Sequence, residues 1–157
     1  MAPGTCGSAR PVGGSAAYLR TKVLQFTGFD TTSAAGIVTN FRGKRLPYSP
    51  KWQLSGSVVA DAPVSDTLGV LAALNVSYQT QSKAVLGDEP GNEIPEYALV
   101  GAKLGVHVAN DGWRLEGFLS NLFDKYYWSS TQRGNEALVR FTGMPRSYGL
   151  RGTFSFR

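Results

Sequence analysis

The sequence predicts an all-β protein in which about six antiparallel strands follow one another up and down. Two observations favour this fold class. Apolar and polar residues alternate along several stretches, with the period of two that is typical of strands. Gly accounts for 19 of the 157 residues and charged residues for only 17%. This composition disfavours helices, because each interior Gly costs a helix about 1 kcal/mol.

The predicted strands differ in how clearly they alternate. The first, around residues 18–26, is the weakest, because neither of its faces is uniformly apolar. A shorter run at residues 113–120 alternates except at Phe118. The clean runs, in which every even position is apolar, aromatic or Gly, cover residues 52–62, 68–78, 98–108 and 148–156.

The connections between these strands alternate in length. Short turns are predicted at residues 63–66 and at Asn110–Gly112, where Asn-Asp-Gly is a strong hairpin sequence. The long connections cover residues 28–50, 82–95 and 129–143. Long loops at one end of a sheet and short turns at the other are typical of a transmembrane β-barrel. We divide the chain into a flexible leader, residues 1–14, and one β domain, residues 15–157.

Composition and charge disfavour several other classes. The net charge is +5, but no run of Lys or Arg occurs, so nucleic acid is not an expected partner. The longest strongly apolar stretch, Thr67–Val76, is half as long as a spanning helix requires. Cys6 is the one cysteine, so no internal disulfide is expected. The first seventeen residues hold no continuous apolar segment, so we predict no signal peptide in this sequence.

The distribution of charge indicates which face of the strands is in contact with lipid. In the five cleaner strands the apolar rows hold no charged residue, whereas the opposite rows hold Asp61, Lys103, Arg114, Glu116, Arg151 and Arg157. Large aromatic residues lie at the row ends, as in the interfacial girdles of membrane barrels. The residues predicted at the membrane interfaces are Trp52, Tyr78, Trp113, Tyr126, Tyr127, Trp128 and Tyr148. A soluble β-sandwich or β-barrel that binds a ligand, with the apolar rows turned inward, remains the alternative.

Three segments resemble one known family. Residues 121–127 read Asn-Leu-Phe-Asp-Lys-Tyr-Tyr, residues 143–157 close the chain with a strand ending in Phe-Ser-Phe-Arg, and residues 43–52 read Gly-Lys-Arg-Leu-Pro-Tyr-Ser-Pro-Lys-Trp. Together they resemble the C-terminal end of a TonB-dependent receptor of the Gram-negative outer membrane. The resemblance covers residues 43–157 and, weakly, the strand before them.

This resemblance implies an uptake transporter for a scarce nutrient, of the siderophore, cobalamin or carbohydrate class. It implies a 22-stranded barrel with a plugged lumen, of which six strands are about a quarter. Nothing in the sequence matches the plug or the segment that recruits the energy-coupling TonB protein. The expected chain is therefore a C-terminal barrel portion, open if alone and insoluble in water.

The implied partners follow from the same resemblance. They are outer-membrane lipid, the remaining strands and plug, the barrel-assembly machinery, and TonB through the missing N-terminal region. The expected location is the outer membrane. Phe154 and Phe156 form the expected assembly signal, although Arg157 follows them where the family commonly ends on an aromatic residue. The runner-up among membrane proteins is a small, self-contained eight-stranded barrel, for which two strands are lacking.

The sequence offers no catalytic, cofactor or metal site. His107 is the one histidine and has no partners at metal-ligand spacing, so we expect a polar residue of the barrel lumen. Asp61 and Glu116 are expected to line the same wet interior. Asp124 and Lys125 are expected to lie just outside the membrane. No nucleophile elbow or phosphate loop occurs, so we predict no enzyme. The loop with Arg133 and Arg140 is a candidate for ligand contacts, but the substrate-binding residues are unknown.

Overall fold

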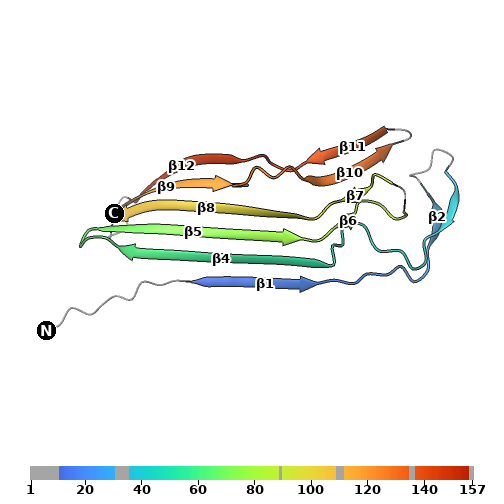
Figure 1. Ribbon diagram of the computed structural model, residues 1–157, viewed down its shortest axis with the longest axis horizontal. Helices are drawn as coiled ribbons and strands as arrows, with labels where there is room; N and C mark the ends of the chain where they lie inside the picture. The colour runs from blue at the N-terminus through green and yellow to red at the C-terminus, as the bar shows by residue number, and fades with distance from the viewer. Residues whose placement is uncertain (1–10, 31–35, 89, 109–111, 135–136, 156–157) are drawn as a thin grey trace.

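A computed structural model describes residues 11–30, 36–88, 90–108, 112–134 and 137–155. Its main feature is one antiparallel sheet of six strands, in which neighbours in the sheet follow the chain order (Figure 1). The strands of this sheet are β1 (Val12–Tyr18), β4 (Trp52–Pro63), β5 (Leu68–Gln79), β8 (Tyr97–Val108), β9 (Trp113–Ser120) and β12 (Ser147–Phe154). The predicted all-β, antiparallel, up-and-down fold of about six strands is confirmed.

Three small hairpins occupy the long connections. They are β2 (Thr27–Phe29) with β3 (Val38–Asn40), β6 (Ser82–Lys83) with β7 (Glu93–Ile94), and β10 (Trp128–Gly134) with β11 (Ala137–Thr142). All three lie at the same end of the sheet, which we call the hairpin end (Figure 1). The sequence analysis treated these segments as loops. β2, β3, β6 and β7 have only two or three residues and are too short to show alternation, and β10 and β11 are longer but do not alternate between apolar and polar residues. No helix of the described residues is long and apolar enough to span a membrane.

The opposite end, the turn end, holds the short connections. Between β4 and β5 the backbone N–H groups of Val64 and Ser65 both donate to the carbonyl oxygen of Leu68. The predicted Asn-Asp-Gly turn lies mostly outside the described residues, but β8 and β9 pair in antiparallel register on either side of it. The two kinds of connection therefore separate to opposite ends of the sheet, as the sequence predicts.

The first strand begins earlier than predicted. β1 covers Val12–Tyr18, whereas residues 19–26 belong to no strand. It pairs with β4 from Val12 opposite Val58 to Tyr18 opposite Trp52. Gly, Ser and Ala fill most of β1, so its two faces differ little in polarity and the alternation is hidden. Residues 12–14, which we assigned to the flexible leader, lie in this strand. Residues 1–10, including Cys6, lie outside the described part.

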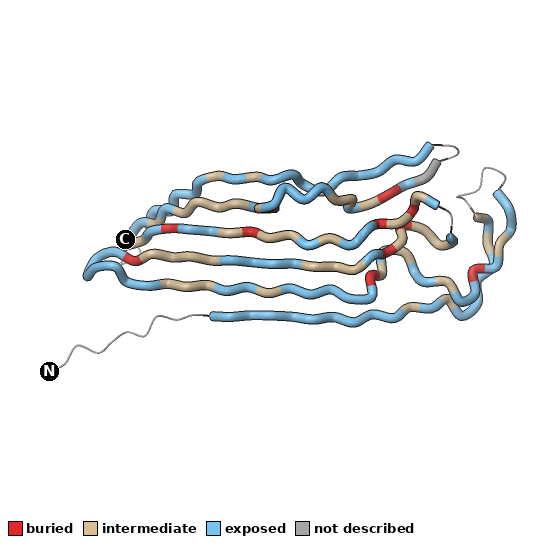
Figure 2. The backbone as a smooth tube through the Cα atoms, in the orientation of Figure 1, coloured by how far each residue is buried: buried red, intermediate tan, exposed pale blue. Residues whose placement is uncertain are grey.

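The buried apolar side chains lie near the hairpins and not on the sheet. Phe41, Ala84 and Ile94 are buried there, while most of the six-stranded sheet is exposed or half-buried (Figure 2). Leu74, Val106 and Phe154 are 45%, 37% and 70% exposed. Within the described residues, these apolar rows meet no second layer. This argues against the soluble sandwich, whose apolar rows must pack against each other.

Candidate functional site: the two faces of the sheet

The register brings the apolar rows of all six strands onto one face, which we call the apolar face. Leu74 of β5 lies opposite Val58 of β4 and Ala102 of β8, and Ala102 in turn lies opposite Leu119 of β9. Since side chains alternate along each strand, one such cross-strand row determines the whole face. Every residue on it is apolar, aromatic or Gly.

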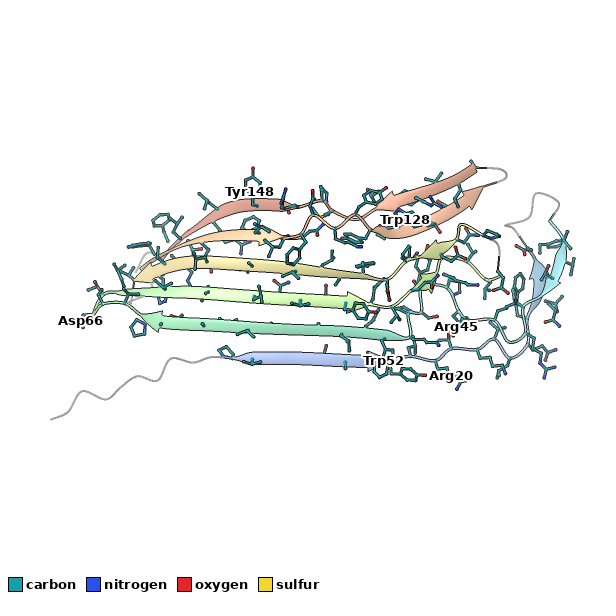
Figure 3. The ribbon with its side chains drawn as sticks, in the orientation of Figure 1. Arg20, Arg45, Trp52, Asp66, Trp128 and Tyr148 are labelled. Carbon is teal, nitrogen blue, oxygen red and sulfur yellow. The ribbon has the colours of Figure 1, made fainter. Side chains whose placement is uncertain are left out.

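Aromatic side chains lie at both ends of the apolar face. At the hairpin end are Trp52, Tyr78 and Tyr148, of which Trp52 packs against Tyr18 with ring centroids 4.8 Å apart. Trp113 lies at the turn end, opposite Phe154. Figure 3 shows Tyr148 projecting away from the sheet, and charged residues lie beyond both ends, Arg45 near the hairpins and Asp66 in the β4–β5 turn. Phe156, the second residue of the expected assembly signal, lies outside the described residues.

The Tyr126-Tyr127-Trp128 cluster does not form one surface. The Tyr127 ring packs against Tyr97, with centroids 4.4 Å apart, and Tyr97 belongs to the opposite, polar row of β8. Trp128 begins β10, where the Arg140 guanidinium lies 4.0 Å above its ring. Tyr126 is exposed. Of the residues predicted at the interfaces, Tyr127 and Trp128 therefore lie apart from the aromatic residues of the apolar face.

The other face of the sheet, which we call the polar face, carries a histidine–carboxylate pair. Nε2 of His107 lies 3.0 Å from Oδ1 of Asp61, although β5 separates their strands. The imidazole reaches across Gly69, where a Cβ would lie 2.5 Å from Nε2. The absence of a side chain at this position therefore permits the contact.

Large side chains also cover other glycines of the polar face. A Cβ on Gly101, Gly105 or Gly149 would lie within 3.0 Å of a neighbouring side chain, namely Asn75, Glu116 and Phe118 respectively. At four glycines of the apolar face a Cβ would make only ordinary contacts of 3.5 Å or more: Gly14, Gly56, Gly117 and Gly152. Side chains crowd on the inner side of a curved sheet, where small and large residues must alternate to fit. This difference indicates that the polar face is the concave one.

Charge on the polar face is concentrated on one half of the sheet. The polar rows of β1, β4 and β5 contain one charged residue, Asp61, among Ser, Gln, Asn, Gly and Ala and the apolar Val59, Pro63 and Leu71. The other half holds Lys103, Arg114, Glu116 and Arg151, with Glu116 directly opposite Arg151. A hollow of about 120 Å³ lies between Lys103, Glu116 and Arg151. Arg157, which belongs to the same predicted row, lies outside the described residues.

The Asn-Leu-Phe-Asp-Lys segment after β9 forms a hydrogen-bonded corner. The buried Asn121 amide donates to the carbonyl oxygens of Lys125, at 3.0 Å, and Met144, at 3.2 Å, and its Oδ1 accepts the Lys125 N–H at 2.8 Å. Oδ1 of Asp124 accepts the backbone N–H of Arg146. These bonds join the end of β9 to the segment before β12, which gives Asn121 and Asp124 a structural role.

Comparison with known proteins bears on the fold. No protein-family model and no curated protein matches the sequence. Among solved structures, the ferric yersiniabactin uptake receptor FyuA from Yersinia pestis matches with a TM-score of 0.66 at 18% identity, over 76% of this chain and 19% of that receptor. The sheet has the fold of part of a TonB-dependent receptor barrel. This barrel segment spans about a fifth of the receptor that it matches. That receptor, FyuA, is a transport receptor and not an enzyme.

The hairpin end of the barrel segment holds a charged cleft. Lys44, Lys83 and Asp88 line a cavity of about 280 Å³. Both ammonium groups contact the Asp88 carboxylate, from Lys83 at 2.5 Å and from Lys44 on the other side. These contacts lower the pKa of Asp88 to about 2. The same cations make the cleft attractive to an anionic group.

Sequence reasoning missed this cleft because its residues come from separate connections. Lys44 lies within the segment 43–52 that supports the family resemblance, but Lys83 and Asp88 lie about forty residues further on. Tyr48 joins these two connections and links them to the third: its N–H donates to the Lys83 carbonyl oxygen, and its hydroxyl lies 2.7 Å from Oγ of Ser130.

No metal centre is evident in the part of the chain that the structure describes. There, no group of three or more His, Cys, Asp and Glu side chains lies close enough to hold an ion. His107 has a single carboxylate beside it. The sheet therefore has a polar face that suits contact with water and an apolar face that suits contact with hydrocarbon.

Proposed function

We propose that this chain forms part of the wall of an outer-membrane receptor that takes up a scarce nutrient. The apolar face meets lipid and the concave polar face lines the aqueous lumen. The observation that carries the proposal is the apolar face itself, which is free of charge across six strands and is exposed or half-buried along its length. Lipid requires such a face, because Lys or Arg at the midplane of a barrel costs about 2–4 kcal/mol.

The nutrient belongs to the siderophore, cobalamin or carbohydrate class. FyuA takes up ferric yersiniabactin, which favours a ferric siderophore among these. The charged cleft of Lys44 and Lys83 at the hairpin end suits an anionic ligand, since the longer loops of such barrels face the exterior. The remaining strands and plug complete the receptor, TonB acts through its N-terminal region, and Phe154 and Phe156 are read by the barrel-assembly machinery.

Neighbouring residues of one strand test the orientation. Leu104 lies on the apolar face of β8 and Lys103 on the polar face. In a Cys6→Ser background, Lys103→Cys should react rapidly with a water-soluble maleimide in isolated envelopes, and Leu104→Cys should react at least tenfold more slowly. In detergent-free denaturant both should react equally. Equal labelling in the envelope, or faster labelling of Leu104→Cys, would contradict the proposed orientation.

Fractionation tests the location and the size of the assembled protein. An antibody to residues 129–143 should detect the protein in the outer-membrane fraction of the producing cells. The soluble binding module predicts instead a band in the soluble fraction without detergent, and that result would remove the membrane proposal. The apparent mass also shows whether the chain works as part of a longer receptor or with separate polypeptides.

A further inference from the structure

The charged cleft at the hairpin end is lined by more cations than carboxylates. Lys44, Arg45 and Lys83 line its cavity of about 280 Å³, and Asp88 is the one carboxylate among the described residues that do so. Both lysine ammonium groups contact the Asp88 carboxylate. The cleft therefore already contains an anion, and that anion belongs to the protein itself.

The backbone around the two lysines is held by hydrogen bonds. The carbonyl oxygen of Lys44 accepts the N–H of Val23 at 2.9 Å, and the Lys44 N–H donates to the carbonyl oxygen of Phe41 at 3.1 Å. Lys83 belongs to β6, and its carbonyl oxygen accepts the N–H of Tyr48 at 2.7 Å. The side chains of Lys44 and Lys83 are 38% and 37% exposed. Both cations are therefore fixed at their base by the fold.

Asp88 is held less firmly than the lysines. Its side chain is 59% exposed, and its backbone forms no hydrogen bond with another described residue. It lies between Gly87 and Gly91, whose φ angles of 122° and 90° are in a region that other residues rarely adopt. An exposed ion pair contributes little net free energy, because water competes for both partners. The carboxylate can therefore leave the cleft while the lysines stay in place.

We propose that Asp88 fills the anion site of the ligand-free receptor, and that an oxyanion with two or more negative charges binds by displacing it. Sulfate-like groups, phosphate-like groups and clustered carboxylates share this chemistry. Their several oxygens can accept charge-assisted hydrogen bonds from Lys44, Arg45 and Lys83 at the same time. A single carboxylate adds no more charge than Asp88 already supplies. This inference rests on the proposed function, in which the cleft receives an anionic ligand.

Displacement has a structural consequence at the hairpin end. The contact between Lys44 and Asp88 joins the connection before β4 to the connection between β6 and β7. An anion that takes the place of Asp88 removes this contact, whereas the bond between Tyr48 and Lys83 is kept. Ligand binding is thus coupled to release of the Asp88 segment.

Competition by Asp88 differs measurably from simple repulsion. If Asp88 must leave, every anion loses the same factor in affinity, which is the fraction of time for which the cleft is free. If Asp88 stayed beside the bound anion, the repulsive energy would be proportional to the charge of that anion. Repulsion would then weaken binding of a dianion by the square of the factor for a monoanion.

The binding test uses the protein purified from outer membranes in mild detergent, at constant ionic strength. Calorimetry measures the affinity for sulfate, and competition against sulfate measures that for acetate. Asp88→Asn should raise both affinities by the same factor, roughly tenfold if Asp88 fills the cleft about nine-tenths of the time. Lys44→Gln with Lys83→Gln should abolish sulfate binding. The matched control Asp66→Asn removes the same charge at the turn end and should change neither affinity.

A second measurement follows the displacement directly. In saturating sulfate, which remains a dianion in weak acid, the carbon NMR titration midpoint of the Asp88 carboxyl group should rise from about 2 toward 3.8. In chloride of equal ionic strength it should not rise. The Asp88→Asn spectrum identifies the signal.

Three results would overturn this inference. They are an unchanged sulfate affinity in Asp88→Asn, a gain for sulfate equal to the square of the gain for acetate, and an Asp88 midpoint that stays near 2 in saturating sulfate. If the protein is in the membrane with the labelling pattern described above, such results remove this inference alone. Absence from the membrane removes the proposed function and this inference with it.

Discussion

At the scale of single residues, several positions of the polar face require glycine because a large neighbouring side chain lies over them. Gly69 lets the His107 ring cross β5 to Asp61, and three further glycines are covered in the same way. A barrel interior uses small residues where a large neighbour needs room. The pairings were not readable from the sequence, because Asp61 and His107 are 46 positions apart.

Replacement of Gly69 tests this arrangement. Gly69→Ala places a methyl group where the imidazole lies, so the ring must turn away and the contact with Asp61 is lost. We expect a loss of about 1 kcal/mol in the free energy of unfolding, the usual worth of one hydrogen bond. Thermal unfolding in detergent measures it. Gly56→Ala is the control on the apolar face and should be neutral, because a Cβ there would make only an ordinary contact of 3.9 Å with the Gly13 carbonyl oxygen; an equal effect there would refute the explanation.

Asn121 combines two structural requirements. Its backbone has φ of 50°, which few residues other than Gly, Asn and Asp adopt readily, and its buried amide makes three hydrogen bonds. Asn121→Gly keeps the conformation and loses the amide, for which we expect a loss of about 2 kcal/mol. Asn121→Ala should lose roughly 1 kcal/mol more. Chemical denaturation in detergent checks the order; Ala as stable as Gly would contradict it.

The Asp88 carboxylate makes the stability of the hairpin end depend on pH. Its pKa is lowered to about 2 by contacts with Lys44 and Lys83. Because the pKa is lower in the folded protein, the contribution to stability is present above about pH 4 and is lost as the pH falls toward 2. A carbon NMR titration of the Asp88 carboxyl group should have its midpoint near 2.

The paired variant Lys44→Gln, Lys83→Gln isolates the cause of that shift. With both ammonium groups removed, the midpoint for Asp88 should rise toward the ordinary value of 3.8. A midpoint that stays near 2 in this variant would show that the lysines do not lower it. Lys103→Gln, on the polar face away from the cleft, should leave the midpoint unchanged.

At the scale of elements, each central strand separates two environments. In β5, Leu74 lies on the apolar face and Leu71 on the polar face opposite Asp61. Strand register, and not residue type, therefore decides which of two leucines meets lipid. The short hairpin strands differ, because β2, β3, β6 and β7 have only two or three residues and show no alternation. They are defined by antiparallel backbone pairing with each other.

The two leucines of β5 form a matched pair for substitution. Leu74→Arg places a charge at the centre of the apolar face and should cost about 2–4 kcal/mol in lipid, so little protein should accumulate in the outer membrane. Leu71→Arg faces the aqueous side near Asp61 and should accumulate normally. Quantitative immunoblotting of membrane fractions measures both. Equal accumulation would show that the apolar face does not contact lipid.

At the scale of the whole molecule, the six strands form an open sheet. Within the described residues, β1 and β12 each pair with one neighbour only, so each has an outer edge with unused backbone hydrogen-bonding groups. Such edges pair with other strands, in a completed barrel or in an aggregate. The apolar face adds to this tendency in water.

The 157-residue polypeptide produced by itself in aqueous solution should therefore be insoluble. Ultracentrifugation after expression should find it in the pellet, and only detergent or denaturant should extract it. Asp or Lys at several apolar-face positions would be needed to keep it dispersed. A soluble, monodisperse preparation of the unaltered chain would contradict both the open sheet and the lipid-facing surface.

The sequence by itself determined the strands of clean alternation, the chemistry of each face and the ends at which long and short connections lie. These properties are local, because the period of two is set by the geometry of a single extended chain. Only the tertiary structure decided the position of β1, the three hairpins, the pairing of Asp61 with His107 and the cleft at Asp88. Each of these depends on register between segments far apart in the chain, and register is the outcome of packing across strands.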